Sequence, residues 1–336
     1  MIPDPDRFAG CLVGQALGDA LGFVVEGQSP QVCRSYVDLT VRGGRAELAR
    51  RGTFPFGQYS DDTQLARELL RSYVDRGGFE PGDYALRIAL LFAQQRVVGR
   101  GKATEDAAKR LAAGVPWTEA GTPAPAAGNG SAMRAGPVGL MFFDDAVALC
   151  RAAHDQGRIT HADPRCSAGA VAVAGAVALA MQGRPVDPRR FLDYLATWAA
   201  ARDAGFAADL RRLADWVVLA PEDAVTFISR AGLPPDHRDM WPGISPFVVG
   251  SVLWSLYAFL RHPDDYMAAV CTAIAVGGDV DTTAAMTGAI AGARVGLAGI
   301  PADLAAHLTD QGDWGRAELV DLARAAWHLK TEGVRP

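Results

Sequence analysis

The sequence predicts an all-α protein, and three observations lead to that prediction. Alanine, leucine and arginine, which favour helices, fill long runs of the chain. The chain contains no series of short alternating segments separated by turn dipeptides, the pattern of a β-protein. Two long segments carry glycine at four-residue spacing, which places the glycines on one face of a helix. We therefore expect a single compact multi-helix bundle, formed by one domain over residues 1–336.

Apolar residues recur at helical spacing along most of the chain, and this periodicity predicts the positions of the helices. The apolar stretch from Ser167 to Met181 is shorter than the roughly 20 residues that span a bilayer, so it predicts a helix buried on all sides. Two irregular stretches, Gly114–Gly139 and Leu233–Pro246, show no shift in composition, so neither predicts a linker between domains. Helices are expected near 5–21, 61–76, 81–99, 104–113, 144–155, 164–182, 188–200, 207–218, 222–231, 247–260, 264–275, 282–297 and 315–329.

The two glycine-striped helices should lie in the middle of the bundle. A glycine in a helix interior costs roughly 0.5–1 kcal/mol, so the stripes need a structural reason. Close approach between two packed helix backbones supplies that reason. Asp19 and Glu26 flank the end of the first stripe, where a solvated helix-end role would account for both. The stripes consist of Gly10, Gly14, Gly18 and Gly22 in the first helix and Gly288, Gly292 and Gly296 in the second.

Charge and cysteine usage exclude several classes of function. The net charge is −5, from 33 basic and 38 acidic residues, and the chain has no basic stripe of the kind that follows nucleic-acid phosphates. The five cysteines are widely spaced and form no CxxC pair, which is typical of buried thiols in a reducing compartment. The amino terminus lacks the features of a signal peptide. We therefore expect a cytoplasmic protein whose primary partner is neither nucleic acid nor a membrane.

Ser60, Asp61 and Asp62 stand at the start of the helix expected at 61–76. Adjacent carboxylates with a hydroxyl before them offer the hard oxygen ligands that a divalent cation prefers. An N-cap explains the same residues without a metal, because serine and aspartate are favoured there and acidic side chains suit the positive end of the helix dipole. This motif alone leaves both interpretations open.

A second acidic motif, Asp279-Val280-Asp281-Thr282, immediately precedes the second glycine-striped helix. Two glycines before it would let the backbone turn tightly beside a cation, although an N-cap is again an alternative. Four carboxylates at two helix starts would repel one another unless cations neutralised them. If the two helix starts meet in space, two divalent cations, Mg²⁺ or Mn²⁺, are the cofactors that the pattern predicts.

The segment Gly128–Pro137 is rich in glycine and lies in the long irregular stretch. Closely spaced glycines free backbone N–H groups to hold an anion such as a diphosphate, and Ser131 and Arg134 could add side-chain donors. His161 precedes the Asp163-Pro164 pair, which predicts the start of the buried helix. From that position His161 could reach a ligand, although a structural role is the usual one for such a histidine.

These segments follow one another in an order that resembles the ADP-ribosylglycohydrolase family, which includes the dinitrogenase reductase-activating glycohydrolase. The resemblance spans almost the whole chain, and five motifs in the family's order are far more specific than any one of them. It implies an all-helical bundle that holds two Mg²⁺ or Mn²⁺ ions and hydrolyses the bond from ADP-ribose C1″ to a modified side chain or small group. The segments are GCLVGQALGDALGFVVEG at 10–27, YSDDTQ at 59–64, GNGSAMRAGPVG at 128–139, THADP at 160–164 and AVGGDVDTTAAMTGAIAGARVG at 275–296.

The resemblance also implies roles for individual residues. Glu26 matches the family's glutamate after GDALG, which is implicated in catalysis, and either Glu26 or Asp62 would be the acid/base group. The implied metal ligands are Ser60, Asp61, Asp62, Asp279, Asp281 and Thr282. The implied substrate-binding residues, which wrap the diphosphate and distal ribose or lie against the substrate, are Gly128, Asn129, Gly130, Ser131, Met133, Arg134, His161 and Phe247.

The chain departs from the family pattern mostly on the substrate side. Ser60 stands where threonine is frequent and keeps the hydroxyl, and Val280 stands where a polar residue is frequent. Phe247 stands where the family often has a tyrosine, so it can stack on a substrate but cannot donate a hydrogen bond. The proline-rich lead-in from Pro234 to Pro246 is also unusual. The identity of the aglycone, the group attached to C1″, is therefore open.

Three functions remain compatible with the sequence. The first is hydrolysis of an ADP-ribosyl group from a protein side chain, with an ADP-ribosylated protein as partner. The second is cleavage of an N- or O-ribosyl bond in a small metabolite derived from NAD or a nucleotide. The third is a non-catalytic protein that binds ADP-ribose or has a structural role, which the chemically competent ligand positions and Glu26 argue against.

Overall fold

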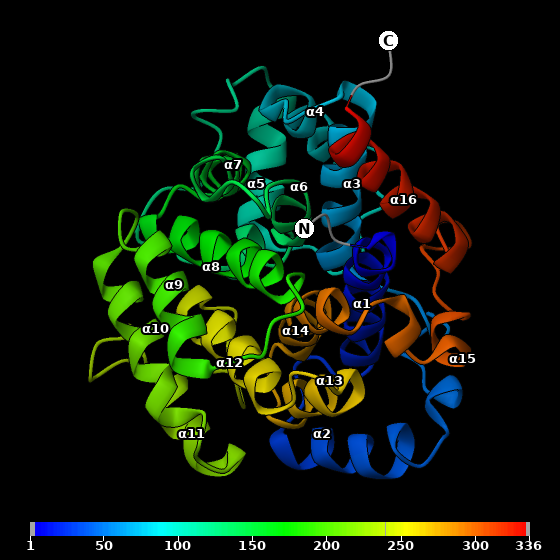
Figure 1. Cartoon of the computed structure of the whole chain (residues 1–336), viewed down its shortest axis with the longest axis vertical. Helices are drawn as coiled ribbons and strands as arrows, with labels where there is room; N and C mark the ends of the chain where they lie inside the picture. The colour runs from blue at the N-terminus through cyan, green and yellow to red at the C-terminus, as the bar shows by residue number, and fades with distance from the viewer. Residues whose placement is uncertain (1–3, 239, 334–336) are drawn as a thin grey trace.

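The computed structural model describes residues 4–238 and 240–333, and in these ranges the protein is built from helices without a β-sheet (Figure 1). The all-α prediction is therefore confirmed. Short non-α helical turns occur at Val37–Val41, Ala46–Leu48, Asn129–Ser131 and Leu297–Gly299. The α-helices are α1 (Pro5–Phe23), α2 (Pro30–Tyr36), α3 (Asp61–Arg76), α4 (Pro81–Ala93), α5 (Lys102–Ala112), α6 (Gly136–Met141), α7 (Ala146–Arg158), α8 (Pro164–Ala180), α9 (Pro188–Ala199), α10 (Ala204–Trp216), α11 (Pro221–Ile228), α12 (Val248–Arg261), α13 (Tyr266–Ala275), α14 (Val280–Val295), α15 (Ala302–Ala305) and α16 (Arg316–Glu332).

The glycine-striped helices α1 and α14 pack against each other in the centre of the molecule (Figure 1). They run antiparallel, since Gly10 faces Gly292 and Gly22 faces Val280. A Cβ atom added to Gly14 would lie 2.5 Å from the carbonyl oxygen of Gly288, so a larger residue does not fit there. The predicted close approach is confirmed. Its consequence is that the carboxyl end of α1 lies beside the amino end of α14.

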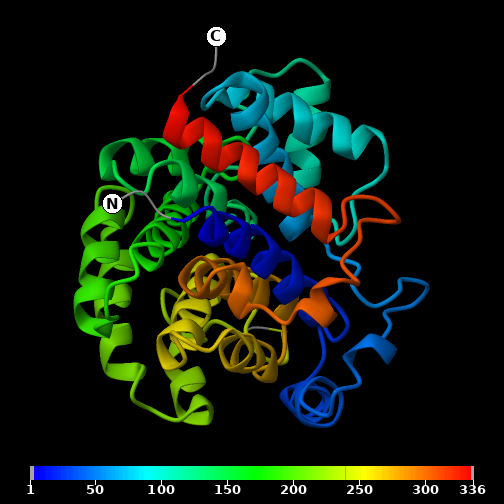
Figure 2. The ribbon, with the colours of Figure 1, turned by 45° about the vertical axis from the view of Figure 1, so that its right-hand side comes forward.

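Other helices enclose this central pair. Helix α16 runs along α1 on one side, as Figure 2 shows, and α3 and α6 also contact α1. Helices α8, α12 and α13 pack against α14. Nearly every residue of α8 from Cys166 to Ala180 is buried, as the apolar stretch predicts. None of the helices in the described ranges combines the length and the apolar character needed to cross a membrane.

The structure corrects several expected helix boundaries. The helix expected at 81–99 ends at Ala93, because the chain turns at Gln95, whose φ of 55° is incompatible with a right-handed helix. Three short helices, α2, α6 and α15, were not expected at all. Helix α6 begins inside the stretch Gly114–Gly139, which is expected to be irregular, and Pro137 occupies its first turn, where a missing N–H costs nothing.

Candidate active site

The two acidic motifs meet in space although they lie far apart in the sequence. The Thr282 hydroxyl oxygen lies 3.3 Å from Asp62 Oδ2 and also 3.3 Å from Asp279 Oδ1. The Ser60 hydroxyl donates a hydrogen bond of 2.8 Å to Asp62 Oδ2. The starts of α3 and α14 therefore converge, which is the condition that the sequence could not test. Ser60 is also the N-cap of α3, so the capping interpretation and the site geometry both hold for it.

Glu26 joins this cluster from the turn that follows α1. One carboxylate oxygen each from Glu26, Asp279 and Asp281 lie within 4.8 Å of one another, close enough to share a metal ion. The antiparallel packing of α1 on α14 explains the proximity, because it brings residue 26 alongside residues 279–281. Backbone hydrogen bonds fasten the turn, since Gly27 N donates to Gly278 O at 2.8 Å and Gly278 N donates to Gln28 O at 3.0 Å.

The aspartate carboxyl groups of the cluster are almost completely buried, and burial raises their pKa values. Burial raises the pKa of Asp279 to about 6. It also holds the pKa values of Asp61, Asp62 and Asp281 well above the ordinary aspartate value, with the negative charges of neighbouring carboxylates adding to the effect. Such a concentration of buried acidic groups disfavours the ionised state unless positive charge is supplied.

The donor set fits hard divalent cations. Asp62 Oδ1 is buried and has no hydrogen-bond partner, although a buried carboxylate oxygen normally has one. The surrounding donors are carboxylate and hydroxyl oxygens, the ligands that Mg²⁺ and Mn²⁺ prefer. An unpaired, enclosed oxygen on Asp62, a residue that the Thr282 hydroxyl joins to Asp279, is what a metal site requires. The ligand roles of the predicted residues stay predictions.

Asp19 is a site residue whose role the sequence did not reveal. It is fully buried inside α1, not solvated at a helix end, which corrects the sequence interpretation. Its carboxylate accepts hydrogen bonds from Ser60 N at 2.9 Å and from both the N–H and the hydroxyl of Thr63, at 3.1 and 2.6 Å. Asp19 therefore holds the first turn of α3 against α1. A carboxylate within an apolar, glycine-striped helix is the signal that could have found it.

The segment between α4 and α5 is a second contributor that the sequence did not indicate. Asp61 N donates to Val98 O at 2.7 Å, and Gly101 supplies a backbone hydrogen bond to the Asp61 carboxylate. Gly99 has a positive φ of 78°, and a Cβ there would lie 3.2 Å from Asp61 Oδ1. The two glycines let the backbone pass close to Asp61.

The glycine-rich loop 128–134 reaches the cluster through Asn129. Its side-chain amide donates to Asp279 Oδ2 at 2.5 Å and to the Ser251 hydroxyl at 3.0 Å. The carbonyl of Met133 accepts a hydrogen bond from the Gln15 side chain, which also donates to Asp62 O; both distances are 3.0 Å. The loop is therefore tied to α1, α3 and α14 at once.

Ser131 and Arg134 direct their side chains into the protein interior. The Ser131 hydroxyl donates to Cys166 O at 2.9 Å. Arg134 is fully buried and donates to the Gln156 side chain at 2.9 Å and to the Thr160 hydroxyl at 2.8 Å. These hydrogen bonds attach the loop to α7, to α8 and to the turn between them. Direct donation from either side chain to an anion stays a prediction.

His161 lies directly beside the loop. Its Nδ1 is 2.8 Å from the Thr160 hydroxyl oxygen, and a Cβ added to Gly130 would lie 3.2 Å from its Nε2. Burial, together with the positive charge of Arg134, lowers the pKa of His161 to about 3. The imidazole is therefore neutral near pH 7. Its Nδ1 is hydrogen-bonded to Thr160, and its Nε2 lies next to the backbone of Gly130.

Phe247 is the N-cap residue of α12 and lies beside Gly128, with which it forms an isolated β-bridge. Its ring is half-buried and faces the Arg165 guanidinium, whose central carbon is 5.4 Å from the ring centroid. The lead-in segment 234–246, of which residue 239 lies outside the described residues, ends in a close contact with the site, because Asp279 N donates to Ile244 O at 2.8 Å.

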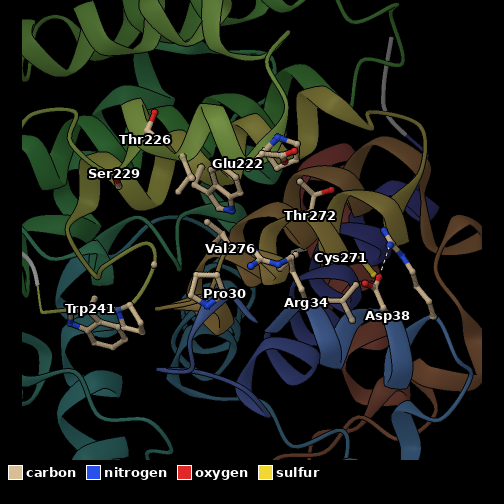
Figure 3. Close-up of a pocket in the computed structure, with 18 residues that line it drawn as sticks. Pro30, Arg34, Asp38, Glu222, Thr226, Ser229, Trp241, Cys271, Thr272 and Val276 are labelled. Carbon is tan, nitrogen blue, oxygen red and sulfur yellow. Dashed lines mark hydrogen bonds and ion pairs between the residues drawn. The ribbon is translucent and has the colours of Figure 1, made fainter. Parts of the chain in front are cut away.

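A pocket of about 650 Å³ lies between α2, α11 and α13 (Figure 3). Arg34, Trp241 and Val276 are among its lining residues, and none of the predicted site residues lines it. It borders the segments that carry the site, since a Cβ added to the lining residue Gly243 would overlap the backbone of Gly277. The pocket and the carboxylate cluster are therefore separate features that share a backbone wall.

Comparisons with known proteins agree with this arrangement. A model of the ADP-ribosylglycohydrolase family matches residues 2–334. The chain is 31% identical to "ADP-ribosylhydrolase ARH3" of Gallus gallus, with 89% of this chain and 88% of that protein covered. It is 27% identical to "ADP-ribosylarginine hydrolase Tri1" of Pseudomonas putida (strain GB-1), with 88% and 72% covered. A solved "ADP-ribosylglycohydrolase-related protein complex" superposes with a TM-score of 0.71 at 29% identity, covering 98% of this chain and 100% of that one.

Proposed function

This chain belongs to the ADP-ribosylglycohydrolase family, and from that premise we propose that it is a divalent-cation-dependent hydrolase of ADP-ribosyl groups on protein side chains. Its family and relatives support ADP-ribosyl hydrolase activity, because relatives are named for hydrolysis of ADP-ribosyl groups. We further propose that the bond hydrolysed is the one from C1″ to the side chain, and that the cofactor is a pair of Mg²⁺ or Mn²⁺ ions.

The observation that carries the proposal is the meeting of two acidic helix starts with Glu26. Three carboxylates from two segments come within 4.8 Å of one another. The Thr282 hydroxyl joins Asp62 to Asp279, and Asp62 Oδ1 is buried without a partner. A structural N-cap role would not require carboxylates from opposite ends of the chain to converge. The ligands of the ions would be Ser60, Asp61, Asp62, Asp279, Asp281 and Thr282.

When bound, such cations act as Lewis acids that polarise oxygen atoms of the substrate and offset the charge of the carboxylates. The residues of the chain contribute to catalysis in three further ways. Negative carboxylates around C1″ stabilise the positive charge of an oxocarbenium-like transition state. Glu26 or Asp62 exchanges a proton with the attacking water or the leaving atom. The burial of the cluster excludes bulk water and strengthens these electrostatic effects.

The backbone of the glycine-rich loop, together with His161 and Phe247, forms a wall for the substrate beside the cluster. The backbone of the Gly128–Gly130 segment has the glycines needed to approach a diphosphate closely, and the neutral His161 supports it from one side. Phe247 pairs with Gly128 through the backbone, which places it beside the loop, and stacking of its ring on a sugar or a base would compete with the contact to Arg165. Asn129 connects this wall to Asp279.

The proposal is tested with ADP-ribosylated peptides in the presence of Mg²⁺ or Mn²⁺, by measuring released ADP-ribose. We expect turnover that a chelator abolishes, and we expect the pairs D61N/D62N and D279N/D281N to lose both cation binding, measured by calorimetry, and turnover. The matched control is D303N, since Asp303 is exposed on α15. Full activity of the metal-free protein would refute the mechanism.

Hydrolysis of a ribosyl bond in a small metabolite is the second candidate. The observation that favours it is Phe247, because the phenyl ring offers no hydrogen bond at a position that contacts the glycine-rich loop. NAD-derived glycosides, supplied beside the peptides, separate the two candidates. Release of ribose phosphate or ADP-ribose from the glycosides alone would favour the second.

A further inference from the structure

Arg51 pairs with the proposed catalytic carboxylate. It lies in the irregular segment between α2 and α3, and its Nη1 donates both to Glu26 Oε2 and to Phe23 O, the latter at 3.0 Å. Its guanidinium carbon lies 4.4 Å from the centroid of the Phe23 ring, which Phe54 contacts edge-on. The arginine is thus held by a carboxylate, a carbonyl and an aromatic face together.

This position is at the open edge of the site. The side chain of Arg51 is 37% exposed and that of Glu26 is 21% exposed, whereas the neighbouring Asp279 and Asp281 are buried. A substrate whose C1″ lies at the carboxylate cluster must direct its leaving group away from the buried side. If Glu26 exchanges a proton with the leaving group, the Glu26 carboxylate and the leaving group are within hydrogen-bond distance of each other. Arg51 donates to the same carboxylate, so its guanidinium would lie within a few ångströms of the leaving group.

A protein recognises a guanidinium with a carboxylate that accepts its N–H groups and with an aromatic ring beneath its plane. Glu26 and Phe23 are such a pair, and Arg51 already occupies it. A substrate guanidinium would therefore meet a like charge and find its partner engaged.

We propose that Arg51 is a specificity-determining residue that excludes cationic aglycones, so that the site prefers an uncharged, hydroxyl-derived aglycone such as serine to the guanidinium of arginine. This inference rests on the proposed function and names its substrate class. A different role, in which Arg51 only positions Glu26, makes a different prediction, because loss of positioning lowers the rates on all substrates alike.

The test compares kcat/KM for ADP-ribosyl-serine and ADP-ribosyl-arginine peptides of the same sequence. We expect the wild-type protein to favour the serine peptide. In R51Q, which removes the charge, the arginine-to-serine ratio should rise at least about tenfold, equivalent to about 1.4 kcal/mol. R51K keeps the charge and should retain the wild-type ratio even if both rates fall. R50Q is the matched control, since Arg50 is an exposed neighbouring arginine.

A second measurement uses agmatine, a small guanidinium compound, as an inhibitor of serine-peptide hydrolysis. Its inhibition constant should fall in R51Q and stay unchanged in R51K and R50Q. Equal loss of rate on both peptides in R51Q, an R51K ratio like that of R51Q, or a wild-type protein that prefers the arginine peptide would overturn the inference and leave the proposed function intact. A wild-type protein that hydrolyses neither peptide would instead reject the proposed function.

Discussion

Asp19 and Asp279 are carboxyl groups enclosed by protein, and burial raises the pKa of the first to about 7 and of the second to about 6. Each is stabilised by hydrogen bonds, Asp19 by Ser60 and Thr63 and Asp279 by Asn129, but these bonds do not cancel the cost of burying the charge. The metal-free protein therefore binds protons more tightly when folded than when unfolded.

The stability of the metal-free protein should fall as pH rises from about 4 to about 7. A raised carboxyl pKa contributes stability that is complete below the unfolded value near 4 and is lost as pH passes the folded value. For Asp19, a rise from 3.8 to about 7 corresponds to at most about 4 kcal/mol. Urea unfolding of chelator-treated protein at pH 5 and pH 7.5 measures the effect, and D19N should reduce it. A higher midpoint at pH 7.5 would contradict the prediction.

The candidate site was predictable where its residues are neighbours in the sequence. Ser60, Asp61 and Asp62 are adjacent, so a hydroxyl and two carboxylates at one helix start were visible as a motif. Asp19 was not, because its partners are more than forty positions away and its burial depends on the packing of α3 on α1. Arg51 reaches Glu26 only through an irregular segment, for which periodicity predicts no geometry.

Glycine spacing determines how the two central helices meet, and this is the element-level cause of the site. The contacts of α1 with α14 involve backbone atoms along the whole stripe, from Gly10 opposite Gly292 to Gly22 opposite Val280. A shift of one helix along the other would place larger residues at these contacts. The register is therefore restricted, and with it the distance between Glu26 and the start of α14.

The same substitution at two glycines should have opposite effects. In Gly18→Ala the new Cβ would overlap the carbonyl oxygen of Ala284, so we expect a loss of about 1–3 kcal/mol in the free energy of unfolding and weaker cation binding. In Gly82→Ala, in the first turn of α4, the Cβ meets nothing within 4 Å, so we expect no loss, or a gain of about 0.4–1 kcal/mol. Urea unfolding and calorimetry with Mn²⁺ measure both effects, and equal unfolding energies would contradict the packing argument.

The helices were predictable in proportion to their length and their end signals. Helix α8 begins at Pro164 behind the N-cap Asp163 and continues as one apolar run, so its extent was clear. Helix α6 contains six residues within a glycine- and proline-rich stretch, too few for a periodic pattern. The end of α4 at Ala93 depends on the turn at Gln95, for which the sequence has no glycine or proline signal.

In the whole molecule, the candidate site joins segments from opposite ends of the chain. The end of α1, the start of α3 and the start of α14 meet there, and Asn129 and Gln15 connect them to the glycine-rich loop. In the absence of a cation these segments are held together against the repulsion of their carboxylates. Cation binding should therefore stabilise the tertiary fold and not only the local geometry.

Mn²⁺ or Mg²⁺ should raise the melting temperature of the protein in a concentration-dependent way. A ligand that binds only the folded state adds about 2.7 kcal/mol when its free concentration is about a hundred times Kd. Differential scanning calorimetry at pH 7.5, after chelator treatment and readdition of the cation, measures this shift. D281N should melt at a temperature that the cation no longer changes, because it removes a buried charge from the cluster. D303N should respond as the wild-type protein does. A shift of the same size in D281N would mean that the cation binds elsewhere, and the convergence of α1, α3 and α14 would then need an explanation other than metal binding.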